Sequence, residues 1–173
     1  MCSSDLIRDA DAVRAALDKL ATDITRQLAD EHPLVLVVMR GGVFFAGQLL
    51  PLLRFPLELD YVHASRYGND LSGRQLQWKA LPPQGVKGRC VLVLDDILDA
   101  GETLAAIRQQ VMEAGATRCV VAVLTEKETG VSKPIRADFV GLTLPNRYVF
   151  GCGLDVSGAW RNLPEIYALK ETL

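Results

Sequence analysis

The chain of 173 residues is long enough for one globular domain with a full hydrophobic core, and short for two. Hydrophobic residues make up 49% of it and charged residues 23%, a composition that excludes intrinsic disorder. The formal net charge of −2 gives no general attraction to nucleic acid or to an anionic membrane surface. We therefore expect one domain over 1–173 that binds neither nucleic acid nor membrane.

The four cysteines, at positions 2, 90, 119 and 152, form no CxxC pair and no cluster with histidine. Cys90 and Cys119 lie beside apolar runs, where cysteine is typically a small core residue. The acidic N-terminus, MCSSDLIRDADAV, lacks the apolar run of a signal peptide, and no stretch is long and apolar enough to span a bilayer. These features favour a reducing, cytoplasmic location.

The first half of the chain alternates helical and extended patterns. Apolar residues recur at spacings of three and four over Asp11–Glu31, which predicts an amphipathic helix. The apolar run LVLVVM at Leu34–Met39 then predicts a strand buried on both faces. Two glycines end this strand. A helical pattern over Val43–Leu53 follows, and Pro56–Ala64 is predicted to be a second strand.

The segment at about 65–87 differs from its surroundings, because it is rich in glycine, asparagine, aspartate and proline. A connection of this length inside a compact domain is typical of a lid or a binding loop. Its middle, Arg74–Trp78, alternates polar and apolar residues, which favours a hairpin arm.

The second half of the chain continues the alternation. A helix is predicted over Thr103–Ala114, and strands are predicted at Cys90–Leu94, Arg118–Leu124 and Phe139–Leu142, with Tyr148–Gly153 as a further candidate. Strands that alternate with helices predict an α/β domain with a mainly parallel central sheet flanked by helices.

The segment VLVLDDILDAGET, at 91–103, carries the clearest chemical signal. Ligands of open α/β sheets bind at the carboxyl ends of strands, where Asp95 and Asp96 are expected. The start of the following helix, at Gly101 and Thr103, offers N–H groups and a hydroxyl that suit a phosphate. Acceptors for diol hydroxyls beside donors for phosphate favour a site for ribose 5-phosphate.

Three other interpretations compete for this segment. Paired aspartates after a strand are typical of a Walker B element, but the chain contains no G-x-x-x-x-G-K-[ST] sequence. The DDxxD spacing also occurs in prenyl-diphosphate synthases, which are larger and all-helical, and the valine-rich strand fits them badly. A lone aspartate at a helix start most often caps the helix, whereas three acids followed by glycine and threonine favour a ligand site.

VLVLDDILDAGET resembles the phosphoribosyl-diphosphate (PRPP) motif of the type I phosphoribosyltransferases, and over Leu34–Leu163 the chain is similar to their hypoxanthine-guanine branch. The resemblance implies that family's α/β fold, with a small hood from about 145–173 and part of the N-terminus, and with a mobile lid at about 65–87. It implies that Asp95 and Asp96 contact the ribose and Mg²⁺. The residues implied for the 5-phosphate are Asp99, Ala100, Gly101, Glu102 and Thr103.

One position in this motif departs from the family. Threonine or serine is common there where this chain has Ala100, so one hydroxyl contact to phosphate is missing. We expect the backbone N–H groups across the same loop to hold the phosphate, because they do not depend on that side chain.

Two further places in the chain resemble the parts of the family that handle pyrophosphate. In VVMRGGVFFAGQL, Arg40 and Gly41 match its pyrophosphate loop, which makes the Met39–Arg40 peptide bond a candidate for cis geometry, and Arg161 matches another pyrophosphate contact. The lid of the family carries an adjacent Ser-Tyr pair. Here the corresponding residues are Ser65, Arg66 and Tyr67, so the tyrosine matches and the serine does not.

The resemblance also implies a purine pocket. Lys127 corresponds to the lysine that binds the purine 6-oxo group, Tyr148 to the aromatic that stacks on the base, and Asp155 to a carboxylate on a second Mg²⁺. A cation aimed at O6 favours hypoxanthine, guanine or xanthine over adenine, whose 6-amino group is a donor. The other residues expected at the base are Ile97, Arg147 and Val149.

The activity that the resemblance implies is purine salvage. PRPP and hypoxanthine or guanine would give IMP or GMP and pyrophosphate, with Mg²⁺ as cofactor and Asp99 as the general base at N7. Members of the family usually form dimers or tetramers, so a homo-oligomer is expected. The alternatives are a PRPP- or nucleotide-sensing regulator on the same fold, and a transferase for another base such as xanthine. The three loop carboxylates and the nearly balanced charge favour an enzyme.

Overall fold

The computed structural model describes the backbone of residues 4–67 and 75–170, and the side chains of these residues except 65–67, 75 and 76. A helix with the length and apolarity needed to cross a membrane does not occur in this part of the chain.

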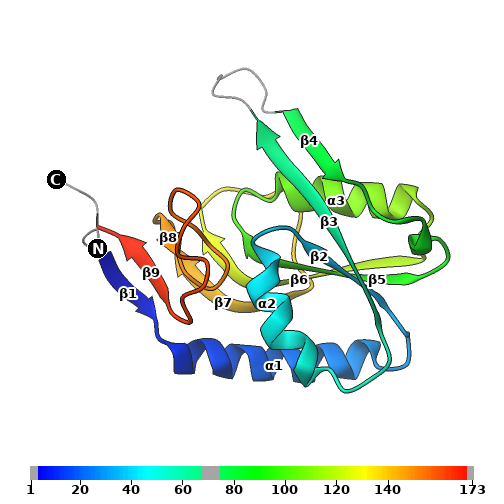
Figure 1. Ribbon diagram of the computed structural model, residues 1–173, viewed down its shortest axis with the longest axis horizontal. Helices are drawn as coiled ribbons and strands as arrows, with labels where there is room; N and C mark the ends of the chain where they lie inside the picture. Colours follow the sequence, from blue (N-terminus) through cyan, green and yellow to red (C-terminus); the bar gives the residue numbers. More distant parts are fainter. Residues whose placement is uncertain (1–3, 68–74, 171–173) are drawn as a thin grey trace.

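Six strands form the central sheet, in the order β4-β3-β2-β5-β6-β7 (Figure 1). Every neighbouring pair is parallel except β3 and β4, which pair antiparallel at the edge. The predicted α/β fold with a mainly parallel sheet is therefore confirmed. The strands are β2 (Leu34–Val38), β3 (Glu58–Tyr67), β4 (Gln75–Ala80), β5 (Cys90–Leu98), β6 (Arg118–Glu128) and β7 (Phe139–Pro145).

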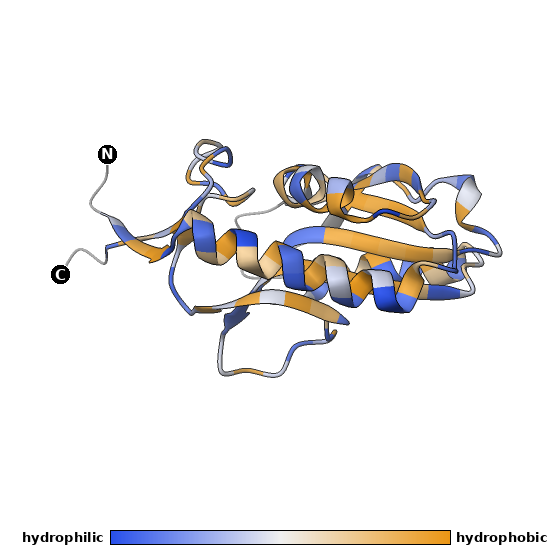
Figure 2. Cartoon of the chain, turned by 90° about the horizontal axis from the view of Figure 1, so that it is seen from below, coloured by the Kyte–Doolittle hydropathy of each residue, from blue (hydrophilic) through white to orange (hydrophobic). Residues whose placement is uncertain are grey.

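Helices cover both faces of this sheet. Helices α1 (Ala10–Leu28) and α2 (Gly42–Leu49) pack on one face, and α3 (Glu102–Glu113) packs on the other. Figure 2 shows hydrophilic and hydrophobic bands alternating along the ribbon of α1, as expected of the predicted amphipathic helix. Successive residues of β2 contact opposite layers, since Val35 lies in the cluster with α1 while Leu34 lies in the cluster with α3. This two-sided burial explains why the sequence of the strand is continuously apolar.

Element boundaries shift from the predicted ones for local reasons. Helix α1 begins earlier than predicted, because Asp9 accepts a hydrogen bond from the backbone N–H of Ala12 and caps it. The expected hairpin arm exists, with β4 as its second strand. Two short 3₁₀ helices, Leu50–Leu52 and Gln84–Val86, follow α2 and β4 respectively.

The segments expected to form a hood make a second sheet of three antiparallel strands, in the order β1-β9-β8. They are β1 (Ser4–Arg8), β8 (Val149–Phe150) and β9 (Ile166–Leu169), and we call this sheet and the loop 151–165 the hood. The candidate strand at Tyr148–Gly153 is present as β8 but is shorter than expected, and it belongs to the hood. Only two of these residues are extended, because Gly151 and Gly153 adopt φ of 96° and 102° and end the strand.

Candidate functional site

Two adjacent carboxylates are buried near the carboxyl end of β5. Asp95 and Asp96 are each 8% exposed, although most buried residues of the described chain are apolar. The backbone N–H of Asp96 donates to Asp95 Oδ1 at 2.9 Å, and the buried hydroxyl of Thr125 donates to the carbonyl of Asp96 at 2.8 Å. Strand β5 lies between β2 and β6, so the carboxylates occupy the middle of the sheet.

Two glycines make room for the Asp96 carboxylate. A Cβ atom added to Gly41 would lie 2.0 Å from Asp96 Oδ2, so no side chain fits at that position. A Cβ added to Gly153, whose φ is 102°, would lie 2.3 Å from the carbonyl oxygen of Gly41 and 3.1 Å from Asp96 Cβ. The loop after β2, strand β5 and the hood therefore meet at this carboxylate.

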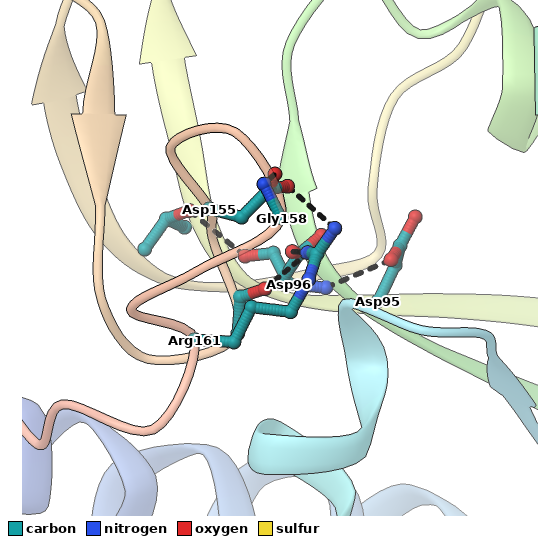
Figure 3. A network of polar contacts seen from close by, with 7 residues as sticks. Asp95, Asp96, Asp155, Gly158 and Arg161 are labelled. Atoms are coloured by element: carbon teal, nitrogen blue, oxygen red, sulfur yellow. Dashed lines mark hydrogen bonds and ion pairs between the residues drawn. The ribbon is translucent and has the colours of Figure 1, made fainter.

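Arg161 ties the hood to the buried carboxylates (Figure 3). Its Nη2 pairs with Asp155 Oδ1 at 2.5 Å, and its Nη1 lies 3.9 Å from Asp96 Oδ2. Nη1 also donates to the carbonyl of Gly153, and Asp155 accepts from the backbone N–H of Gly158 at 2.7 Å. Asp155 thus faces Arg161 rather than Asp95.

The surroundings of the two buried carboxyls disfavour their negative charges. Burial raises the pKa of both Asp95 and Asp96, and the charge of Asp96 raises the pKa of Asp95 further, while Arg161 opposes both effects. A hard cation beside them would offset this cost, and carboxylate oxygens are the ligands that Mg²⁺ prefers. The side chains thus fit a Mg²⁺ ion.

The side chains alone do not complete a coordination shell. Within residues 4–67 and 75–170, no three Cys, His, Asp or Glu side chains are grouped closely enough to hold a metal. A cation at Asp95 and Asp96 would take its remaining ligands from a bound substrate and water, which is the usual manner of Mg²⁺ binding.

Two cavities share Asp99 at this end of the sheet, and the larger of the two has a volume of about 510 Å³. It brings together most of the residues predicted for phosphate, ribose and pyrophosphate. From the predicted set, its lining includes Arg40, Gly41, Asp95, Asp96, Ile97, Asp99, Ala100, Gly101, Thr103 and Arg161. The Met39–Arg40 peptide bond beside it, which the sequence made a candidate for cis geometry, is cis.

The start of helix α3 forms one wall of the larger cavity. Gly101 precedes the helix with a φ of 86° and, as a glycine, has no side chain with which to cap it. The N-terminus of a helix of this length carries partial positive charge, which suits an anion. Glu102, also predicted for the phosphate, is exposed in the first turn and does not line the cavity.

A smaller cavity of about 290 Å³ adjoins the larger one. The two share Asp96, Ile97, Asp99 and Arg161 as lining residues. Tyr148 lines the smaller cavity with 57% of its surface exposed, whereas Val149 beside it is buried. The remaining lining residues of the smaller cavity are Lys127, Leu154 and Asp155.

Lys127 and Asp99 form an ion pair at the junction of the two cavities. Lys127 Nζ lies 2.8 Å from Asp99 Oδ2. The lysine side chain is only 12% exposed, while the aspartate side chain is 50% exposed. Lys127 is therefore not an ordinary solvated lysine, and Asp99 is open to a ligand.

Some predicted residues are not brought into either cavity. Arg147 donates to Asp5 Oδ2 and to the carbonyl of Leu169, both at 2.8 Å, so its guanidinium binds β1 and β9 within the hood. Among the residues lining the two cavities, Arg147 is absent. The predicted lid side chains, Ser65, Arg66 and Tyr67, lie outside the described ones.

The larger cavity also contains two residues that the sequence did not point to, His63 on β3 and Lys79 on β4. Burial and the positive charges of Lys79 and Arg40 lower the pKa of His63. No motif marks either residue. Only the antiparallel pairing of β3 with β4 places Lys79 beside the cavity.

Comparisons with known proteins agree with this arrangement. The phosphoribosyl transferase domain family matches residues 3–157. The hypoxanthine-guanine phosphoribosyltransferase of Streptococcus pneumoniae is 34% identical over 162 residues, which cover 93% of this chain and 90% of the relative. The hypoxanthine-guanine-xanthine phosphoribosyltransferase of Tritrichomonas foetus is 31% identical over 169 residues, which cover 97% and 92%.

A solved structure of a hypoxanthine-guanine-xanthine phosphoribosyltransferase has the same fold. It matches with a TM-score of 0.82 and 30% sequence identity, over 96% of this chain and 97% of that one. The chain belongs to the phosphoribosyltransferase family, in the branch of the hypoxanthine-guanine phosphoribosyltransferases.

Proposed function

We propose that the chain catalyses purine salvage, by transferring the 5-phosphoribosyl group of PRPP to N9 of a 6-oxopurine with release of pyrophosphate. The observation that carries this proposal is the pair of adjoining cavities, which share Asp99 at their junction. The larger one has the donors that a phosphorylated sugar requires. The smaller one has the size and the aromatic wall that suit a base.

The ion pair at the junction matches one edge of a 6-oxopurine. In the N7–H tautomer of hypoxanthine or guanine, the O6 acceptor and the N7–H donor lie side by side. Lys127 supplies a donor and Asp99 an acceptor, 2.8 Å apart. A base that enters here would replace their direct contact with one hydrogen bond to each, while Tyr148 and Ile97 flank its faces. Adenine would instead place an amino donor against the lysine.

PRPP would lie along the larger cavity. The start of α3 would hold the 5-phosphate, and Asp95 and Asp96 would accept from the ribose hydroxyls. At the other end, Arg40, Lys79 and Arg161 offer positive charge to the diphosphate. The lid residues predicted from the sequence, Ser65, Arg66 and Tyr67, would close over the same end.

Asp95 and Asp96 would hold Mg²⁺ together with oxygens of PRPP, and Asp155 would serve a second ion. When bound, the metal supplies a hard positive charge that offsets negative charge on the diphosphate. Arg161 already neutralises Asp155, with an Nη2–Oδ1 distance of 2.5 Å, so that carboxylate has less charge to offer than Asp95 and Asp96.

The transfer breaks the bond between C1 of the ribose and the diphosphate oxygen, and forms a bond between C1 and N9. The bonding pair leaves with the diphosphate, whose growing charge Arg40 and Arg161 would stabilise. Asp99 would take the proton from N7 as N9 attacks. Enclosure between the two cavities and the lid would exclude water, which could otherwise hydrolyse the sugar.

Several broader expectations belong to the same proposal. We propose a single domain over 1–173 that works in the cytoplasm as a homodimer or homotetramer.

The three cysteines among the described residues, Cys90, Cys119 and Cys152, are free. Burial raises the pKa of the Cys119 thiol to about 11 and that of Cys152 to about 12, so both behave as core residues.

Replacing Gly41 by alanine tests the contact on which the site is built. The added Cβ has to displace the Asp96 carboxylate, since it would lie 2.0 Å from Oδ2. We expect kcat/KM for PRPP to fall roughly 100-fold in Gly41→Ala, because displacements of about 1 Å at a reacting centre have effects of that size. Steady-state rates measure the loss.

Gly47→Ala is the matched control for Gly41→Ala. Gly47 lies in α2 and a Cβ there meets nothing within 4 Å, so catalysis should be unchanged and stability should rise by about 0.5–1 kcal/mol. Wild-type kcat/KM in Gly41→Ala would contradict the importance of this contact.

Asp99→Asn tests the general base. The amide cannot accept the N7 proton but keeps the size of the carboxyl, so PRPP binding should persist while kcat falls by roughly 10²–10⁴-fold. Rapid-quench or steady-state rates together with a PRPP titration separate the two effects. Unchanged turnover would remove Asp99 from this role.

Lys127→Ala tests base recognition. Loss of a hydrogen bond from a charged group, worth about 1.5–3 kcal/mol, should raise KM for the 6-oxopurine about 10- to 100-fold. KM for PRPP should change far less, because Lys127 lines the smaller cavity and is absent from the lining of the larger one. An equal rise in both constants would show that Lys127 does not face the base.

A further inference from the structure

A second lysine lies behind the ion pair at the junction and has no place in the proposed chemistry. Lys133 belongs to the connection between β6 and β7, and its side chain is 11% exposed. It lines neither of the two cavities that share Asp99. A lysine of this exposure requires partners for its charge, because burial of an unpaired ammonium is unfavourable.

The Lys133 ammonium finds three partners on two strands. Its Nζ donates to the carbonyl of Leu98 at 3.2 Å, to the carbonyl of Lys127 at 2.7 Å and to Glu126 Oε1 at 3.0 Å. An ammonium has three N–H donors, so this set of acceptors satisfies all of them. The cation joins the end of β5 to the end of β6.

The two carbonyls belong to the backbone that carries the ion pair. Leu98 directly precedes Asp99, and the other carbonyl is that of Lys127 itself. The stem of Lys133 also packs near Gly101, at the proposed 5-phosphate site, since a Cβ on Gly101 would lie 3.5 Å from Lys133 Cβ. One side chain thus constrains both halves of the pair whose Nζ–Oδ2 distance is 2.8 Å.

We propose that Lys133 is a positioning residue, which sets the spacing between the carboxylate of Asp99 and the ammonium of Lys127 to that of the N7–O6 edge of a 6-oxopurine. This role rests on the proposed function. Lys133 acts through Asp99 and Lys127 and does not itself touch the substrate. Removing its charge would free the carbonyls of Leu98 and Lys127 and leave Glu126 unpaired, so the two strand ends would separate or shift.

Lys133→Met tests this role, because it keeps the length of the stem and removes the donors. We expect kcat/KM for the 6-oxopurine to fall about 10- to 100-fold, through a higher KM for the base and a lower kcat. KM for PRPP should stay within about threefold of the wild type, because methionine keeps the stem beside Gly101 and Lys133 contacts no residue of the diphosphate end. Arg136→Met, a change of an exposed cation in the same connection, should behave as the wild type.

A double-mutant cycle with Lys127→Ala separates positioning from general stability. If Lys133 acts through Lys127, the effect of Lys133→Met on KM for the base should largely disappear in the Lys127→Ala background. A merely structural role would give additive losses. Circular dichroism and thermal unfolding show whether Lys133→Met folds. If it does not, Lys133→Gln replaces it in the same kinetic measurements.

The outcomes distinguish this inference from the function on which it rests. Wild-type kinetics in the Lys133 variants, or additive losses in the cycle, would overturn the positioning role while the wild type remains active. Absence of nucleotide formation by the wild type and by Arg136→Met would overturn the proposed function itself.

Discussion

The site depends on the packing of the Asp96 carboxylate against the backbone of Gly41 and Gly153. Three segments that are far apart in the sequence meet there, and a Cβ at either glycine would lie within 2.3 Å of an oxygen atom. Arg161 completes the contact, because it binds the hood loop and lies 3.9 Å from the same carboxylate. The hood is thereby held over the end of the central sheet, which creates two cavities instead of one open edge.

The charged residues at this site favour ligand binding at a cost to the stability of the free protein. Burial raises the pKa of both carboxyls, so their negative charges are unfavourable in the free protein. In the proposed function, a cation bound with the sugar phosphate would offset this cost. Buried carboxylates at this place lower the stability of the fold, and such groups are typical of ligand-binding and catalytic sites. Lys127 and Asp99 pair with each other in the free protein, and in the proposed function a bound base would take the place of this contact.

Much of this could be predicted from the sequence, where local pattern decides the outcome. Continuous apolar runs such as Leu34–Val38 identify the buried parallel strands. VLVLDDILDAGET predicts residues that line the larger cavity, because they are consecutive in the sequence. Contacts between distant segments could not be predicted in this way. The position of Lys79 in the larger cavity depends on the pairing of β3 with β4. The hydrogen bond from Arg147 to Asp5 depends on the pairing of β1 with β9, at opposite ends of the chain. Lys133 has no signal at all in its neighbouring residues.

The most direct measurement of the central claim is nucleotide formation by the wild-type chain with PRPP, Mg²⁺ and each of hypoxanthine, guanine, xanthine, adenine and uracil. A lysine donor beside the Asp99 acceptor requires a 6-oxo group next to N7–H, so we expect product with at least one 6-oxopurine and none with adenine or uracil. Product with adenine alone, or with uracil alone, would contradict the base cavity as described. No product with any base would contradict the transferase itself and favour a PRPP- or nucleotide-sensing regulator.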